Sequence, residues 1–231
     1  MMLDFSDCQV ESITIEARYE PEFALWDRAG AVWTEVQAQF PELRVQAAGP
    51  SQVVFESLDT RAVIELEAFR ASCRGADAER LVAEVSQRML QVCSDRLKLA
   101  VFKRIGLREI RTRSFASTEA AISAVCSLLP QQIAEGLLVG SKFQAINLGV
   151  KQEGETSGLS AAVRAEDREM KLTVPWEVRD RVAGGTPKEH LVLFDSDYYT
   201  VGTTRRAALN IEEWAKQATR TIKRYWKGVL K

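Results

Sequence analysis

Short strand patterns joined by short polar connections constrain the fold of this chain more than any other feature. Residues 12–20 (SITIEARYE) alternate strictly, with Ile13, Ile15 and Ala17 on the apolar side. This period of two predicts a half-buried β-strand. Similar patterns follow at residues 52–57, 61–70, 101–115, 140–152, 159–165, 169–176 and 190–200. Most of the gaps are too short for a crossover connection, so we expect antiparallel pairing.

Amphipathic helix patterns lie between the strands and again at the end of the chain, at residues 21–40, 77–97, 117–129 and from 210 onward. In the first of them Phe23, Trp26 and Trp33 recur at three- and four-residue steps, and we predict that they face the core. Asn210 and Glu213 have the spacing of a capping box, which predicts the start of the last helix. The expected fold class is α+β, with antiparallel sheets and long amphipathic helices packed on them.

Length and composition indicate one well-packed unit. The chain has 231 residues, of which 46% are hydrophobic and 27% charged, and its formal net charge is -1. We treat 1–231 as a single α+β unit. A strand followed by a helix and then several strands occurs near the start and again from Val101, so two similar halves of about 1–98 and 99–231 form the alternative description. Within the strand at 101–115, Gly106 breaks the alternation and predicts a bulge or a close backbone approach.

Several functional classes are excluded by missing residues. His190 is the only histidine, so two-histidine metal sites are excluded and any histidine-dependent catalysis must use it. The four cysteines, Cys8, Cys73, Cys93 and Cys126, lack zinc-ligand spacing. The sequence contains no P-loop, dinucleotide-binding or nucleophile-elbow motif, so we expect no cofactor. A signal peptide and a membrane-spanning apolar run are also missing, which favours a cytoplasmic protein.

Two basic segments are the candidate nucleic-acid or ligand-binding sites. The strand at 98–113 carries Lys103, Arg104, Arg108, Arg111 and Arg113. On the last helix a basic stripe recurs at three- and four-residue steps, with Lys216, Arg220, Lys223 and Lys227. Such clusters contact phosphates, provided that they share one exposed surface. The alternative is that the strand arginines pair across the sheet with Glu16, Glu65 and Glu67.

A weaker candidate is a metal site at Asp195 and Asp197. Two carboxylates two residues apart on a strand point to the same side and have oxygens that suit Mg²⁺. A pair of this kind would support phosphoryl transfer or nuclease chemistry. Aspartates are also common at strand ends and in turns, so that alternative stays open.

Four segments resemble a sporadically distributed prokaryotic protein family of similar length that has no established activity. They are EARYEP at 16–21, FKRIGLREI at 102–110, FDSDYY at 194–199 and IEEWAKQATRTIKRYW at 211–226. The resemblance implies a full-length α+β unit from bacteria or archaea and supplies no catalytic residues. The sporadic distribution of that family favours a defence or mobile-element system.

The first hypothesis from the sequence is a non-enzymatic interaction or accessory module that binds a partner protein or its own copy. Its candidate interface residues are Trp214, Tyr225 and Trp226, because these aromatics do not share one narrow stripe of the last helix. The second hypothesis is nucleic-acid binding through the two basic segments. The third is a magnesium-dependent enzyme that uses Asp195 and Asp197, although the sequence favours a protein without catalytic activity.

Overall fold

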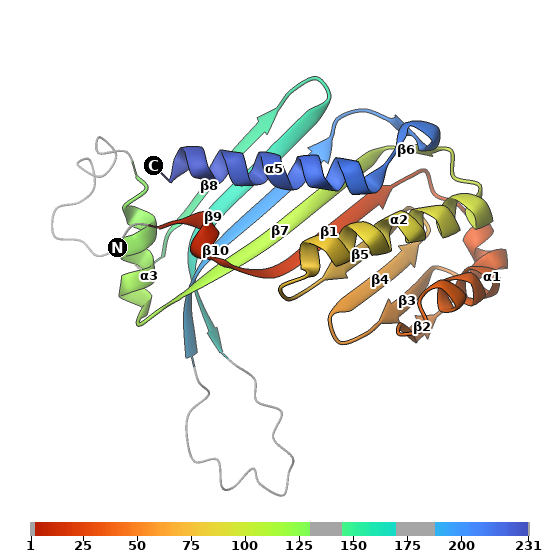
Figure 1. Ribbon diagram of the computed structural model, residues 1–231, viewed down its shortest axis with the longest axis horizontal. Helices are drawn as coiled ribbons and strands as arrows, with labels where there is room; N and C mark the ends of the chain where they lie inside the picture. Colours follow the sequence, from red (N-terminus) through yellow and green to blue (C-terminus); the bar gives the residue numbers. More distant parts are fainter. Residues whose placement is uncertain (1–2, 130–144, 170–187, 231) are drawn as a thin grey trace, which may run out of the picture.

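The computed structural model describes residues 3–129, 145–169 and 188–230, and within them one antiparallel sheet of nine strands dominates the fold. The strand order is β2-β3-β4-β5-β1-β7-β10-β9-β8 (Figure 1). The strands are β1 (Gln9–Arg18), β2 (Arg44–Ala48), β3 (Gln52–Glu56), β4 (Thr60–Glu65), β5 (Ala68–Cys73), β7 (Arg104–Phe115), β8 (Asn147–Glu153), β9 (Ser157–Glu169) and β10 (Lys188–Thr200). Two short strands, β6 (Val101–Phe102) and β11 (Thr204–Arg205), pair separately.

The helices of the described residues cover one face of this sheet (Figure 1). They are α1 (Ala24–Gln39), α2 (Ala78–Leu97), α3 (Thr118–Cys126) and α5 (Ile211–Val229), with short 3-10 turns at Phe5–Asp7 and Arg206–Ala208. A continuous core fills the space between helices and sheet, and Ile13, Ile15 and Phe194 are fully buried in it. The structure therefore confirms the α+β class that alternation and helical periodicity predict.

Local sequence signals mark the starts of α3 and α5, whereas α1 begins three residues after the predicted start at 21. Ser117 accepts a hydrogen bond from the backbone N–H of Ala120 at 3.2 Å and caps α3. Asn210 accepts one from the N–H of Glu213 at 3.1 Å and caps α5. Each cap satisfies an N–H that the first turn of a helix leaves unpaired.

Two details differ from the sequence-based expectation, and at Gly106 one of the two predicted alternatives is excluded. Residues 61–70 form parts of two strands, β4 and β5, joined at a turn that contains neither glycine nor proline. The edge strand β2 was not predicted, because RVQAA has little β-branched character. Gly106 makes no bulge, but a Cβ there would lie 3.3 Å from the Oδ1 of Asp197, which is a close approach. Apart from Glu169, the strand predicted at 169–176 lies outside the described residues.

The elements on the two sides of the central β1–β7 pair follow the same order. On one side β1 and α1 are followed by strands β2 to β5, of which β5 pairs with β1, and then by α2. On the other side, among the described elements, β7 and α3 are followed by β8 to β10, of which β10 pairs with β7, and then by α5. Since β1 and β7 are antiparallel, this arrangement has the form of a two-fold relation about an axis through the sheet. That 1–98 and 99–231 are repeated halves stays a prediction.

Candidate functional site

The face of the sheet opposite the helices carries paired charges where β1, β7 and β10 lie side by side. Arg104 on β7 donates to the Oδ2 of Asp197 on β10 at 2.5 Å and lies 3.6 Å from Glu16. Arg108 binds both carboxylate oxygens of Asp195, at 2.8 and 2.6 Å. The charges of this surface therefore largely neutralise one another.

This pairing determines what Asp195 and Asp197 can do. The hydrogen bond to Asp195 raises the pKa of Arg108, so the guanidinium stays charged and binds the carboxylate through two bonds. A divalent cation at these carboxylates would have to displace two arginines. Among residues 3–129, 145–169 and 188–230, no three His, Cys, Asp or Glu side chains are grouped to hold a metal ion. The structure thus contributes no observation in favour of a magnesium site.

The basic strand does not form the single exposed surface that the nucleic-acid hypothesis requires. Alternation along β7 places Arg104 and Arg108 on the helix-free face, whereas Arg111 faces the helices and its side chain is only 10% exposed. Arg111 donates to Glu109 at 2.6 Å, and burial raises the pKa of Glu109 against the opposing effect of that arginine. Arg113 lies 3.9 Å from Asp7. The condition that these arginines share one exposed surface with α5 is not met, because successive side chains of a strand lie on opposite faces of the sheet.

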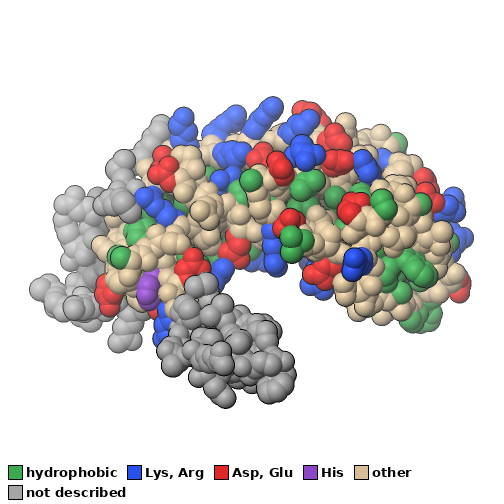
Figure 2. All heavy atoms as spheres, turned by 60° about the horizontal axis from the view of Figure 1, so that its bottom comes forward, with side chains coloured by type: hydrophobic (Ala, Val, Ile, Leu, Met, Phe, Trp, Pro, Cys, Tyr) green, Lys and Arg blue, Asp and Glu red, His purple; other side chains and the backbone are tan. Residues whose placement is uncertain are grey.

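The basic side chains of α5 do form a continuous exposed ridge. Lys216, Arg220 and Lys227 are exposed and make no ion pair within the described part of the chain, while Lys223 pairs with Glu79 on α2 at 2.9 Å. We call these four α5 residues the basic ridge. Basic side chains also line the upper edge of the molecule in Figure 2, the side to which the helices turn in that view.

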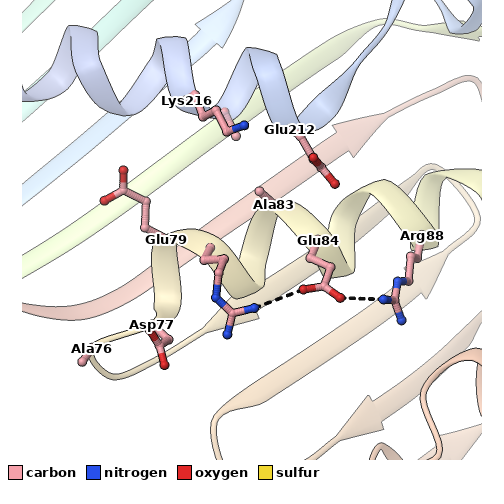
Figure 3. A pocket seen from close by; sticks show the side chains of 10 residues that line it. Ala76, Asp77, Glu79, Ala83, Glu84, Arg88, Glu212 and Lys216 are labelled. Atoms are coloured by element: carbon pink, nitrogen blue, oxygen red, sulfur yellow. Dashed lines mark hydrogen bonds and ion pairs between the residues drawn. The ribbon is translucent and has the colours of Figure 1, made fainter.

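A groove of about 610 Å³ separates the first turns of α2 from α5 (Figure 3). Ala83 and Ala215 form its buried floor. Side chains of both charges surround it: Glu79 and Glu212 are negative, and Lys216 is positive. The mixed rim gives this groove no clear preference for an anionic or a cationic ligand.

The aromatic residues of α5 lie in or against the core. Trp226 is 2% exposed, stacks on Phe5 at 5.9 Å between ring centroids, and donates from Nε1 to the Oγ of Ser196 at 2.7 Å. Trp214 is half-buried and lies 6.1 Å from the ring of Tyr198, and Tyr225 packs edge-on against Trp226. The prediction of an interface at Trp226 is therefore wrong, because the amphipathic face of α5 is wide enough to bury it.

Among the described residues, the exposed aromatic side chains are instead on α1 and at Phe23, the residue before it. Phe23 is 61% exposed, Trp26 56% and Trp33 45%, although the sequence predicted all three in the core. The core side of this helix is formed by Leu25, Val32 and Val36. We call Phe23, Trp26, Gly30 and Trp33 the α1 aromatic face. The signal that could have separated the two sides is the spacing of Leu25, Val32 and Val36, which defines a second complete apolar stripe.

His190 has a polar environment that does not form a catalytic triad. Its Nδ1 lies 2.9 Å from Asp167 and 3.1 Å from the Oγ1 of Thr118. Thr118 also donates directly to Asp167 at 2.8 Å. A triad needs the acid on one ring nitrogen and the nucleophile on the other, whereas both contacts here use the same nitrogen. These three residues link the start of α3 to the sheet.

Two surface features therefore remain as candidate sites: the α1 aromatic face and the basic ridge of α5. No described helix is long and apolar enough to cross a membrane. A scan against protein-family models finds no match to this chain, and a search of curated proteins finds none either.

Proposed function

We propose that this protein is a non-enzymatic interaction module that associates with a second copy of itself through the α1 aromatic face. The observation that carries the proposal is the exposure of Phe23, Trp26 and Trp33 along one helix. Contiguous exposed aromatics are characteristic of binding surfaces and are unfavourable in water. The cytoplasmic location, the resemblance to a sporadic prokaryotic family and a role in defence or mobile elements belong to this proposal as well.

The amount of aromatic surface fits a weak dimer. An aromatic side chain buries about 150–250 Å² when it is fully covered. With exposed fractions of 61%, 56% and 45%, the three side chains leave roughly 240–400 Å² per copy. Two copies would thus bury roughly 500–800 Å² of aromatic surface before flanking residues are added, below the standard interface of about 1,600 Å². We expect a dissociation constant near the weak end for protein interfaces, roughly micromolar.

The spacing of the face favours a second copy as its partner. Phe23, Trp26, Gly30 and Trp33 are separated by three, four and three residues, which reads the same in both directions. In an antiparallel helix pair Trp26 of each copy would lie over Gly30 of the other. A Cβ at Gly30 would have nothing within 4 Å, so there is room for the ring. None of the four residues is charged, so the same patch can face itself without repulsion.

Gly30→Arg tests the proposal without damaging the fold. Arginine fits the open space and is a better helix former than glycine by about 0.5–1 kcal/mol, so the monomer should be at least as stable. It would occupy the position of the partner's Trp26. Ala31→Arg is the matched control, because residue 31 is exposed and lies about 100° further round the helix.

The measurement is the mass in solution by sizing with light scattering, over a concentration series at low and moderate salt. We expect the wild-type mass to rise from 25.8 kDa toward twice that value with concentration and without loss at higher salt. Gly30→Arg should remain monomeric, and Ala31→Arg should behave as the wild type. A wild type that stays monomeric throughout, or equal dimerisation of both variants, would overturn the proposal.

The basic ridge of α5 favours nucleic-acid binding as a second candidate function. Its support is that Lys216, Arg220 and Lys227 are exposed without ion-pair partners in the described residues. Binding would use phosphate contacts and should weaken steeply with salt. Lys216→Glu with Arg220→Glu should abolish binding to a labelled duplex in an anisotropy titration, whereas Glu212→Lys should strengthen it. Unchanged affinity in the double variant would exclude this helix.

A further inference from the structure

A second cavity lies between the N-terminal segment and the end of α5. Its volume is about 880 Å³, within the usual range for small-molecule sites. Its lining combines apolar and basic residues: Leu3, Asp4, Phe5, Ser6, Arg111, Lys223, Lys227 and Leu230. It is separate from the α1 aromatic face, because its lining comes from α5, β7 and the N-terminal segment.

Arg111 forms the inner end of this pocket and is 8% exposed. Its Nε donates to Glu109 at 2.6 Å and its Nη1 donates to the backbone oxygen of Cys8 at 3.2 Å. Its guanidinium also stacks over the ring of Phe5 at 4.8 Å. Its second terminal nitrogen, Nη2, donates no hydrogen bond to the described residues. Held on three sides, this arginine presents a fixed donor to the pocket without further loss of side-chain freedom.

The lysines of α5 add positive charge at the same pocket. Lys223 contributes one ammonium group, although it is shared with Glu79 at 2.9 Å. Lys227 is exposed and makes no ion pair among the described residues. The one acid of the lining, Asp4, already accepts hydrogen bonds from the N–H and the hydroxyl of Ser6. The pKa of Asp4 is lowered by those bonds, so it remains an anion beside three cations.

The remaining part of the pocket wall, away from the cations, is apolar. Leu3 and Phe5 are buried in the core cluster, and Leu230 packs against it from the end of α5. An arginine and two lysines beside such walls fit a ligand with an anionic head and an apolar tail. A free inorganic anion would leave the apolar walls unused. A neutral hydrocarbon would leave Lys227 without an anionic partner, whereas Arg111 and Lys223 are already paired with Glu109 and Glu79.

We infer that this pocket binds a small amphipathic anion, such as a carboxylate on a medium-length hydrocarbon chain. Arg111 and Lys227 bind the head, and Leu3, Phe5 and Leu230 surround the tail. The inference is independent of the proposed self-association, because it uses none of the α1 residues.

Octanoate is a suitable probe, measured by titration calorimetry on the full chain. Octylammonium reverses the head charge, octanol removes it, and inorganic phosphate removes the tail. We expect octanoate to bind at least tenfold more tightly than each of the three. Octanoate that does not bind, or phosphate or octanol that binds equally well, overturns the inference.

Lys227→Glu locates the site, because residue 227 is exposed and its replacement leaves the core intact. Lys216→Glu is the matched control: it has the same charge change on the same helix, away from this pocket. We expect Lys227→Glu to weaken octanoate binding about tenfold or more and Lys216→Glu to change it less than about twofold. Equal effects of the two variants would show that only the general charge of α5 matters and would overturn the assignment.

Discussion

Replacing Trp226 by phenylalanine tests the division between core and surface aromatics. The substitution removes the Nε1 donor that binds the Oγ of Ser196 at 2.7 Å, and Ser196 is fully buried. A buried hydroxyl that loses its partner costs about 1–3 kcal/mol, and the smaller ring leaves a cavity that adds about 1 kcal/mol. We therefore expect the free energy of unfolding to fall by about 2–4 kcal/mol. For a chain of this size that lowers Tm by roughly 4–16 °C.

The matched control is Trp26→Phe, the same change at a side chain that is 56% exposed. We expect its cost to stay within about 0.5 kcal/mol, the usual range for surface substitutions. Urea denaturation followed by far-ultraviolet circular dichroism measures both variants without relying on tryptophan emission. Adding Ser196→Ala to Trp226→Phe should recover part of the loss, because the orphaned hydroxyl is then removed as well. If Trp26→Phe destabilised the monomer as much as Trp226→Phe, the assignment of surface and core would be refuted.

Three further measurements test the packing and charges of the fold. Gly158→Ala should cost about 1–3 kcal/mol in the same urea assay, because the new Cβ would meet the ring of Tyr199, whose Oη lies 2.6 Å away; a neutral result would contradict the close packing. Burial raises the pKa of the fully buried Cys93 thiol to about 12 from an ordinary 9.0, and it also raises the pKa of the half-buried Cys126. Alkylation at pH 8, as measured by mass spectrometry, should therefore be slower at Cys93 than at Cys126, and equal rates would contradict this. Burial raises the pKa of Glu16, but hydrogen bonds from its arginine partners outweigh this and lower it. The contribution of Glu16 to the free energy of unfolding is therefore present above its unfolded pKa of 4.5 and is lost as the pH falls through its lower folded pKa. Glu16→Gln should accordingly flatten the acid side of the profile of stability against pH. An acid side that is unchanged in this variant would contradict the prediction.

Local signals in the sequence are sufficient for most elements of the fold. Alternation in residues 12–20 and 190–200 identifies β1 and β10, because a half-buried strand needs one apolar side. The caps at Ser117 and Asn210 locate two helix starts, because these side chains satisfy backbone N–H groups within three residues. The boundary between β4 and β5 could not be predicted in this way, since its turn is stabilised by contacts such as Tyr19 N–H to the oxygen of Glu67.

The candidate sites were harder to predict because a count of charges along the chain ignores the two faces of a strand. Arg104 and Arg108 lie on one face of β7, and Arg111 and Arg113 on the other, so a cluster in sequence becomes two groups in space. Apart from Glu109, which lies two residues before Arg111 on the same strand, their partners come from β10, β1 and the N-terminal segment, and no local pattern identifies these. The basic ridge could be predicted, since residues three and four apart on a helix share one face.

The helix α1 shows why periodicity alone could not separate core from interface. It is apolar on two sides: Leu25 and Val32 pack against the sheet, and Trp26 and Trp33 lie in water. A helix that is apolar nearly all round is ordinarily buried on every side. At the end of this sheet the neighbours of α1 are α2, β2 and β3, which cover only the first of these sides. The remaining stripe, in which Gly30 lies open between Trp26 and Trp33, is therefore not covered by the described part of the chain. The same stripe of a second copy would cover it.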